Sequence, residues 1–176
     1  MRLFVFALVS TVGVLCAGEL SNRRAPGFSL PDSQLRQWDI QDLRGKVVIL
    51  DIMKTACPSC QKLALTLERV RAKYGNRIQI LSIVNPPDNQ ATVAQFIATY
   101  KVQSPILFDC GQVAASYFKA TPSNPSIHVP HLFLIDGNGM IRNDFAYEDK
   151  TKAIFEGDGL FAEIDKLLAP APAAKK

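Results

Sequence analysis

The sequence predicts an α/β protein in which helices flank a mostly parallel central sheet that ends in an antiparallel hairpin. Two observations predict this class. Apolar runs of strand length alternate along the chain with segments of helical periodicity, and only a short turn separates the last two apolar runs. Such alternation sets parallel strands side by side, with their connecting helices packed on the sheet. A chain of 176 residues without internal repeats fits a single domain.

The central strand is predicted at Val47–Met53, a continuous run of mostly apolar, β-branched residues, as a strand buried on both faces requires. A helix follows over 61–74, where apolar side chains recur at roughly helical spacing. It would stop at Gly75-Asn76. Before the central strand we expect, in order, a polar arm over 21–33 that leads into a short strand at 28–30, a partner strand at 37–40 and a turn at 42–45.

The remaining elements follow from the same two periodicities. Asp136-Gly137-Asn138-Gly139 has the turn chemistry of a hairpin. The Pro, Ala and Lys residues of the end segment, 169–176, are typical of a disordered tail. We expect strands at 78–84, 106–108, 131–135 and 140–145, helices at 90–100, 111–118 and 159–168, and a loop at 119–126.

Cys57-Pro58-Ser59-Cys60 lies at the junction between the central strand and the helix that follows it. The first sulfur is therefore expected at a helix N-terminus. Free backbone N–H groups and the helix dipole stabilise a thiolate there, and the thiolate is the reactive form. The second sulfur lies one turn further on, close enough to close a small disulfide ring. The spacing predicts a redox site.

Two alternatives to redox chemistry remain open from the spacing alone. Cysteines at this spacing also form half of a four-ligand zinc site, but the remaining Cys16 and Cys110 are far apart and make no second pair. The motif is also compatible with an inert structural disulfide. We expect a redox dithiol with no metal and no cofactor. Cys110 itself is expected to be a small buried hydrophobe, the alternative being a second redox centre.

The first 18 residues have the composition of an export signal. Arg2 precedes an uncharged apolar stretch at 3–17, and a cleavage site would follow Ala17 or Gly18. The stretch is shorter than the roughly 20 residues of a membrane-spanning helix. One alternative is an uncleaved signal that anchors the protein in the membrane. Another is a lipoprotein anchored through Cys16, although Gly13-Val14-Leu15 lacks the usual pattern before such a cysteine. In each case we expect a periplasmic or other extracytoplasmic location, where disulfides persist.

The charge pattern argues against a nucleic-acid partner. The net charge is +4, but the basic residues are scattered along the chain. Arg23-Arg24 and Lys175-Lys176 are the only adjacent basic pairs. A nucleic-acid-binding face would instead gather basic residues into a stripe with interleaved aromatic side chains.

Several motifs together resemble the thioredoxin superfamily. Residues 25–30 (Ala-Pro-Gly-Phe-Ser-Leu), the run at 43–50, the C-x-x-C motif and Val129-Pro130 ahead of the strand at 131–135 occur in this order. The arrangement is similar to the exported TlpA/ResA-like branch, which is related to the alkyl hydroperoxide reductase/thiol-specific antioxidant group. The resemblance covers residues 25–168. It implies a three-layer thioredoxin-like fold, a central mixed sheet flanked by helices, with an N-terminal strand extension.

The resemblance also implies three catalytic residues. Cys57 would be the exposed attacking cysteine and Cys60 the buried resolving one. Asp51 matches the buried carboxylate that thioredoxins carry behind the resolving cysteine. Among apolar neighbours an unpaired carboxylate has a raised pKa, so Asp51 would serve as general base for Cys60. The alternative is an aspartate at the open end of the strand, bonded to backbone amides.

The implied substrate-binding residues are Val129, Pro130, Pro58 and Ser59. Pro130 would be a cis-proline that faces the disulfide, and Val129 would offer backbone hydrogen bonds to an extended substrate segment. Cis bonds are a minority among X-Pro bonds and are normally retained for a reason. The alternative is a trans proline that leads into the strand.

The sequence departs from the resembled family in three places. Ala56 stands before the first cysteine where Trp is usual, and Met53 stands where an aromatic residue is common. Segment 118–129 is longer than expected, and we interpret it as a tolerated surface insertion, the alternative being a lid or recognition loop. His128 and His131 flank Val129-Pro130 without an assigned role, the alternative being thiolate stabilisation or metal binding. Strand alternation would aim His131 away from the site.

The expected function is that of an exported thiol-disulfide oxidoreductase acting through a mixed disulfide. Its partners would be exported protein thiols or disulfides and a membrane or periplasmic redox partner. One alternative is a thiol peroxidase-like antioxidant protein, although Lys54 and Leu50 replace the Thr and Pro usual in peroxiredoxins. The other is a copper or zinc chaperone that binds metal through Cys57 and Cys60. Reductase and oxidase directions both stay open.

Overall fold

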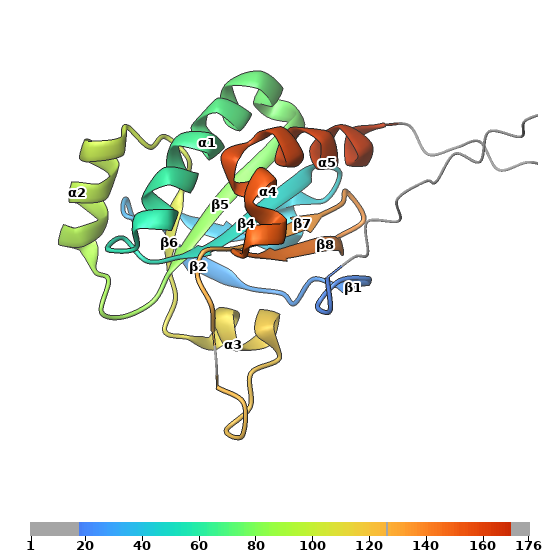
Figure 1. The fold of residues 1–176 in the computed structure, drawn as a ribbon. Helices are drawn as coiled ribbons and strands as arrows, with labels where there is room; N and C mark the ends of the chain where they lie inside the picture. Colours follow the sequence, from blue (N-terminus) through green and yellow to red (C-terminus); the bar gives the residue numbers. More distant parts are fainter. Residues whose placement is uncertain (1–17, 126, 170–176) are drawn as a thin grey trace, which may run out of the picture.

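A six-stranded sheet with the strand order β1-β8-β7-β4-β5-β6 forms the centre of the structure, a computed structural model that describes residues 18–125 and 127–169 (Figure 1). A separate pair, β2 and β3, forms a small hairpin. The strands are β1 (Arg23–Arg24), β2 (Ser29–Pro31), β3 (Gln37–Asp39), β4 (Val47–Met53), β5 (Ile78–Val84), β6 (Ile106–Phe108), β7 (His131–Ile135) and β8 (Met140–Ala146). The helices are α1 (Pro58–Tyr74), α2 (Gln90–Tyr100), α3 (Gln112–Phe118), α4 (Lys152–Glu156) and α5 (Asp158–Leu168), with short 3-10 turns at Ile40–Leu43, Gly75–Arg77 and Asp149–Thr151.

The sheet is mixed, so the expectation of a mostly parallel sheet is wrong. Only the β4–β5 and β5–β6 pairs are parallel, whereas β4–β7, β7–β8 and β1–β8 are antiparallel. The reason lies in the link between β6 and β7. The link contains one short helix, α3, of seven residues, and it does not cross the sheet back to the edge where the parallel strands start. Strand β7 therefore begins at the edge where β4 ends, with His131 opposite Ile52. The mixed three-layer fold implied by the family resemblance is confirmed.

Both faces of the sheet are covered by other elements. Helices α1, α4 and α5 lie on one face, and α3 lies with the β2–β3 segment on the other (Figure 1). Helix α2 packs beside α1 through a third apolar cluster that includes Val93, Phe96 and Ala64. The central strand β4 is buried along its whole length. The molecule thus has three layers with the sheet in the middle.

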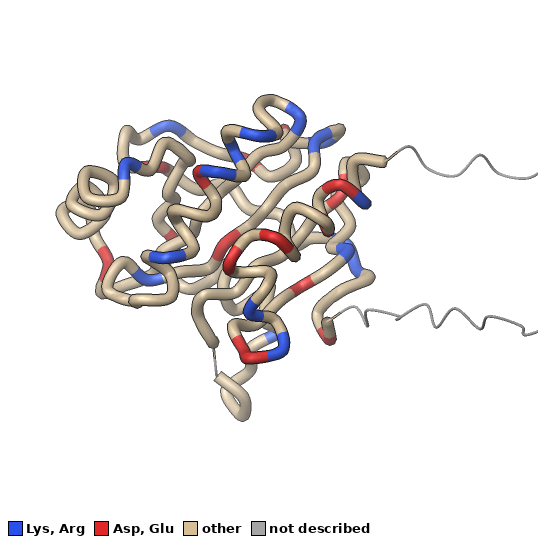
Figure 2. The backbone as a smooth tube through the Cα atoms, turned by 45° about the horizontal axis from the view of Figure 1, so that its top comes forward, with Lys and Arg blue, Asp and Glu red and all other residues tan. Residues whose placement is uncertain are grey.

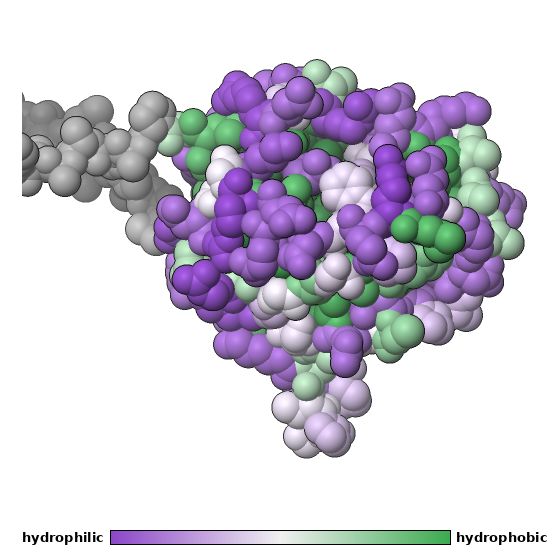
Figure 3. All heavy atoms as spheres, turned by 180° about the vertical axis from the view of Figure 1, so that it is seen from behind, coloured by the Kyte–Doolittle hydropathy of each residue, from purple (hydrophilic) through white to green (hydrophobic). Residues whose placement is uncertain are grey.

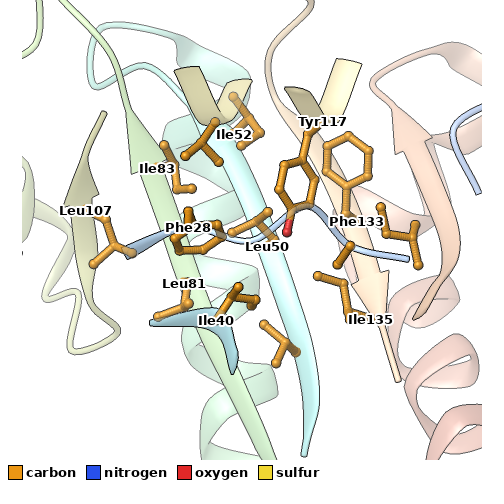
Figure 4. Packing of buried hydrophobic residues seen from close by; sticks show 14 of the residues in the cluster. Phe28, Ile40, Leu50, Ile52, Leu81, Ile83, Leu107, Tyr117, Phe133 and Ile135 are labelled. Atoms are coloured by element: carbon orange, nitrogen blue, oxygen red, sulfur yellow. The ribbon is translucent and has the colours of Figure 1, made fainter. Parts of the chain in front are cut away.

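The core under α3 and the hairpin is built around aromatic rings (Figure 4). Tyr117 packs edge-on against Phe133 at a ring-centroid distance of 5.2 Å and against Phe28 at 6.2 Å. Its hydroxyl donates to the Pro26 carbonyl oxygen at 3.0 Å. Burying an aromatic ring with its polar end satisfied ties the N-terminal segment to the sheet.

The core on the opposite face fixes helix α1. Leu63, Leu67 and Val70 are buried against the sheet. Full burial of such a side chain contributes about 1.5–3 kcal/mol relative to leaving it exposed. Because three such residues hold this helix, its N-terminus has a fixed place at the end of β4.

Two short elements are not predicted from the sequence. Strand β1 pairs with β8, with Arg23 opposite Ile141. Helix α4 has five residues, too few to show a periodicity. The predicted leader at 1–18 and tail at 169–176 lie outside the described residues except for Gly18 and Ala169. Within the described ranges, none of the helices combines the length and apolar character needed to cross a membrane.

Charged side chains are spread over the described surface. Lys or Arg and Asp or Glu are both distributed over many parts of the tube in Figure 2. Seen from behind, the surface is largely hydrophilic with small separated apolar areas (Figure 3). Leu35 is the most exposed of the large apolar side chains that the structure describes, at 83 %.

Candidate active site

Cys57 occupies the N-cap position of α1, directly after the turn that follows β4. Its backbone is extended, and Pro58 starts the helix, where a fixed φ and a missing N–H cost nothing. The Cys60 N–H donates to the Cys57 sulfur at 3.4 Å. The positive end of the helix dipole therefore faces this sulfur. Cys57 is half-buried, Pro58 is exposed and Ser59 is half-buried.

Cys60 is completely buried, in contrast to Cys57. Both are free thiols in this structure. Burial raises the pKa of the Cys60 thiol, and the nearby charge of Asp51 raises it further. A thiol in this position ionises only if a neighbouring group accepts its proton.

Asp51 lies in β4 on the face that carries α1. Its neighbours at alternate positions, Ile49 and Met53, both pack against that helix layer, and side chains two residues apart share a face. The carboxylate is 1 % exposed. Burial raises the pKa of Asp51 to about 7, and a hydrogen bond from Ser82 lowers it in part.

The hydrogen bonds of Asp51 exclude the alternative of a carboxylate held by backbone amides. The Ser82 hydroxyl donates to Oδ2 at 3.3 Å. Oδ1 is buried and has no hydrogen-bond partner among the residues described. Sequence reasoning does not find Ser82 as part of the site. The available signal is that Ser82 interrupts the apolar run at 80–84 in β5 and lies in register with Asp51.

The Val129–Pro130 peptide bond is cis, as expected. Pro130 is buried, and the half-buried Val129 packs against the same apolar cluster as Cys57 and Cys60. The start of β7 lies beside the end of β4. The fold thus brings this segment to the dithiol.

His131 points away from the dithiol, as strand alternation indicates. It stands opposite Ile52 in the sheet, and opposed residues share a face, which here carries α3. Its ring packs against Phe118 at 4.7 Å, and Nε2 lies 3.3 Å from Asp144 Oδ2. Burial alone would raise the pKa of Asp144, but hydrogen bonds that include the one to His131 lower it overall. His128 is exposed.

Cys110 is exposed, so the expectation of a buried hydrophobe is wrong. Strand β6 ends at Phe108, and the cysteine lies in the connecting loop beyond it, where backbone runs at the surface. The buried place is taken instead by Asp109, whose Oδ2 accepts the N–H groups of Val113 and Ala114 at 3.1 Å.

The part of the chain that the structure describes places no cluster of metal ligands at the dithiol. Among residues 18–125 and 127–169, no three or more His, Cys, Asp and Glu side chains form a group able to hold a metal ion. The copper or zinc alternative therefore has no further ligand of these types in that part of the chain.

The fold has three layers around a mixed sheet, with a C-x-x-C motif at the start of α1 and a cis-proline beside it. This combination defines a thioredoxin-like dithiol protein. Residues 21–144 match the AhpC/TSA family, and the chain belongs to that family. The resemblance stated from the motifs is confirmed.

The relatives carry matching names. Thiol-disulfide oxidoreductase ResA of Bacillus thuringiensis (strain Al Hakam) is 26% identical over 135 residues, 77% of this chain and 74% of that protein. Thioredoxin-like protein YneN of Bacillus subtilis (strain 168) is 24% identical over 128 residues, which cover 72% of this chain and 71% of that protein. A solved thiol:disulfide interchange protein of Chlorobium tepidum TLS superposes with a TM-score of 0.69 at 18% identity, over 84% of this chain and 97% of its own. The predicted enzyme class, a thiol-disulfide oxidoreductase, is confirmed.

Proposed function

We propose that the protein exchanges its Cys57–Cys60 dithiol or disulfide with exported protein substrates through a mixed disulfide. One observation carries the proposal. Cys57 is half-buried at a helix N-terminus, whereas Cys60 is fully buried one turn behind it, beside Asp51. This asymmetry lets a substrate reach only the first sulfur and leaves the second for intramolecular closure.

In the reducing direction the exchange has two steps. The Cys57 thiolate attacks a substrate disulfide, an S–S bond forms between Cys57 and one substrate sulfur, and the other substrate sulfur leaves as a thiolate. The Cys60 thiolate then attacks the Cys57 sulfur, the Cys57–Cys60 disulfide forms, and the second substrate sulfur leaves. Two electrons pass from the protein dithiol to the substrate disulfide, and the oxidising direction is the reverse.

Asp51 would move the proton in the second step. The thiol of Cys60 must lose a proton to attack, and burial disfavours its charged form. A carboxyl with a pKa of about 7 is half ionised near neutral pH. Asp51 would accept the proton as general base and return it when the exchange runs backwards.

The surface around the first sulfur would hold the substrate segment. Val129 beside the dithiol would offer its backbone, and Pro130, Pro58 and Ser59 would shape the contact. Ala56 is exposed directly before the motif and presents little surface. The substrate contact would therefore rely on backbone hydrogen bonds more than on aromatic packing.

Export rests on the N-terminal composition. The apolar stretch at 3–17 would direct the chain across a membrane and would either be removed or remain as an anchor. The proposed partners are exported thiols or disulfides and a membrane or periplasmic redox protein that resets the dithiol.

An insulin assay tests the proposal. The reduced protein, supplied with dithiothreitol, is expected to accelerate reduction of the insulin disulfides. Cys57→Ser should abolish this acceleration, and Cys110→Ser, at the exposed free thiol, should leave it unchanged. A wild-type protein that does not accelerate insulin reduction but is oxidised rapidly by hydrogen peroxide would contradict the proposal and favour the peroxidase alternative.

The reduction potential of the dithiol, measured against glutathione, gives the direction. A value near about −270 mV would make the protein a reductant like thioredoxin, and one near about −120 mV a strong oxidant.

A further inference from the structure

We propose that Asp88 is a positioning residue that fixes the turn carrying Cys57, an inference that rests on the proposed function. Asp88 lies in the loop between β5 and α2, whereas Cys57 follows the loop between β4 and α1. The two loops leave the same edge of the sheet because β4 and β5 are parallel neighbours. Neither the C-x-x-C motif nor the family resemblance involves Asp88.

The contact between the loops is a carboxylate that binds both donors of one residue. The Thr55 N–H donates to Asp88 Oδ2 at 3.1 Å, and the Thr55 hydroxyl donates to Asp88 Oδ1. Thr55 is 9% exposed and stands two residues before Cys57. Hydrogen bonds to a charged acceptor are about twice as strong as neutral ones. A paired contact of this kind also fixes orientation.

Asp88 is itself held from the α2 side. The Thr92 hydroxyl donates to Asp88 Oδ1 at 3.1 Å. Thr92 belongs to the capping box of α2, in which it also accepts the Asn89 N–H at 2.9 Å. The carboxylate therefore links the start of α2 to the turn before the dithiol.

Two further polar contacts hold the turn. Gln61 in α1 donates from Nε2 to the Thr55 carbonyl oxygen at 3.0 Å. The Cys57 N–H donates to the Lys54 carbonyl oxygen at 3.2 Å. The backbone N–H, the carbonyl and the hydroxyl of Thr55 thus all have partners, and among the described residues Asp88 is the one partner from outside this turn and helix. Removing that carboxylate leaves the N–H and the hydroxyl of Thr55 without these hydrogen bonds, so the turn is no longer tied to the α2 side.

Release of the turn would affect the chemistry because the reactivity of Cys57 depends on its place at the helix N-terminus. Displacement of a reacting group by 1 Å is able to cost about 100-fold in rate. Asn keeps one acceptor oxygen at position 88, whereas Ala keeps none. Reactivity should therefore fall in the order wild type, Asp88→Asn, Asp88→Ala.

The test is alkylation of the reduced full-length protein by iodoacetamide, with the rate at each cysteine resolved by peptide mass spectrometry. Cys110, an exposed thiol, serves as an internal reference in every sample. We expect Asp88→Ala to lower the Cys57/Cys110 rate ratio at least about fivefold and Asp88→Asn to lower it less. Thr55→Ser keeps both donors and should retain the wild-type ratio.

Asp136→Asn is the matched control. The Asp136 carboxylate accepts the N–H groups of Asn138 and Met140 in the β7–β8 turn, each at 2.9 Å. This turn lies beyond the five residues of β7, about 17 Å along the strand from the cis-proline end. The Asp136→Asn substitution should lower the free energy of unfolding, measured in urea, without changing the Cys57/Cys110 rate ratio.

An unchanged or increased Cys57/Cys110 ratio in Asp88→Ala, together with a lower free energy of unfolding, would overturn the proposal and leave Asp88 a purely structural residue. Alkylation does not depend on disulfide exchange. Failure of the wild-type protein in the insulin assay would therefore reject the proposed function without deciding the role of Asp88.

Discussion

Ser82 donates a hydrogen bond to Asp51 across the β4–β5 pair, with 3.3 Å between the hydroxyl oxygen and Oδ2. It is the single hydrogen bond that the described residues supply to this carboxylate, since Oδ1 has no partner. The proton affinity of Asp51 is therefore set by two opposing effects. Burial raises its pKa, and the Ser82 hydroxyl lowers it by stabilising the charged form.

Ser82→Ala should raise the pKa of Asp51 above its value of about 7, because it removes the group that favours the ionised form. A hydrogen bond to a charged group contributes about 1.5–3 kcal/mol. Its loss should therefore raise the pKa of Asp51 by about one to two. Carbon-13 NMR titration of the labelled carboxyl measures the change. Ser82→Thr, which retains a hydroxyl, is the control. A midpoint in Ser82→Ala equal to that of the wild type would show that the hydroxyl does not tune Asp51.

Asp51→Asn should slow the attack of Cys60 on the mixed disulfide, because the amide does not accept the thiol proton. General bases contribute about 100- to 10,000-fold, so a loss of at least about tenfold at pH 7 is expected. In the wild type the rate should rise through pH 7 as Asp51 ionises, and this rise should disappear in the variant. Stopped-flow decay of a preformed mixed disulfide gives the rates. Equal resolution rates across pH 6–9 would remove Asp51 from the mechanism.

Asp51→Asn should also stabilise the protein above pH 7. The folded carboxyl has a pKa of about 7 against a reference of 3.8, so between these values the folded state holds a proton that the unfolded chain has lost. Stability from this group is complete below pH 3.8, falls as pH rises and is lost above about pH 7. Between the two ends of this pH range, the titration of Asp51 changes the free energy of unfolding by on the order of 4 kcal/mol.

Urea unfolding of both proteins at pH 5 and pH 8 measures this effect. The gain of the variant over the wild type should be larger at pH 8 than at pH 5. A gain that does not change between the two pH values would mean that Asp51 titrates at its ordinary value in the folded protein.

The sequence predicts the main elements well because their signals are local. The apolar run of β4 and the spacing of Cys57 and Cys60 each lie within a few residues, and the structure has them at the expected places. The buried position of Asp51 follows from the same run. The mixed direction of the sheet is different. It depends on how far the α3 link carries the chain, which apolar periodicity does not encode.

The contacts that tune the site are less accessible to sequence reasoning. Thr55 and Asp88 are 33 residues apart, and Ser82 is 31 residues from Asp51. Each pair forms only because β4 and β5 are parallel neighbours in a fixed register. Cys110 is a different case. Its position just beyond an apolar strand predicts a buried thiol, but the chain has already left the sheet after Phe108, and the side chain is exposed.

Covalent trapping of a substrate shows whether Cys57 forms the mixed disulfide. The Cys60→Ser protein is incubated with a model protein disulfide, and the adduct is mapped by mass spectrometry. We expect a stable mixed disulfide at Cys57, no such adduct in Cys57→Ser, and rapid release in the wild type because Cys60 resolves it. An adduct confined to the exposed Cys110, or none at any cysteine, would contradict thiol-disulfide exchange through Cys57.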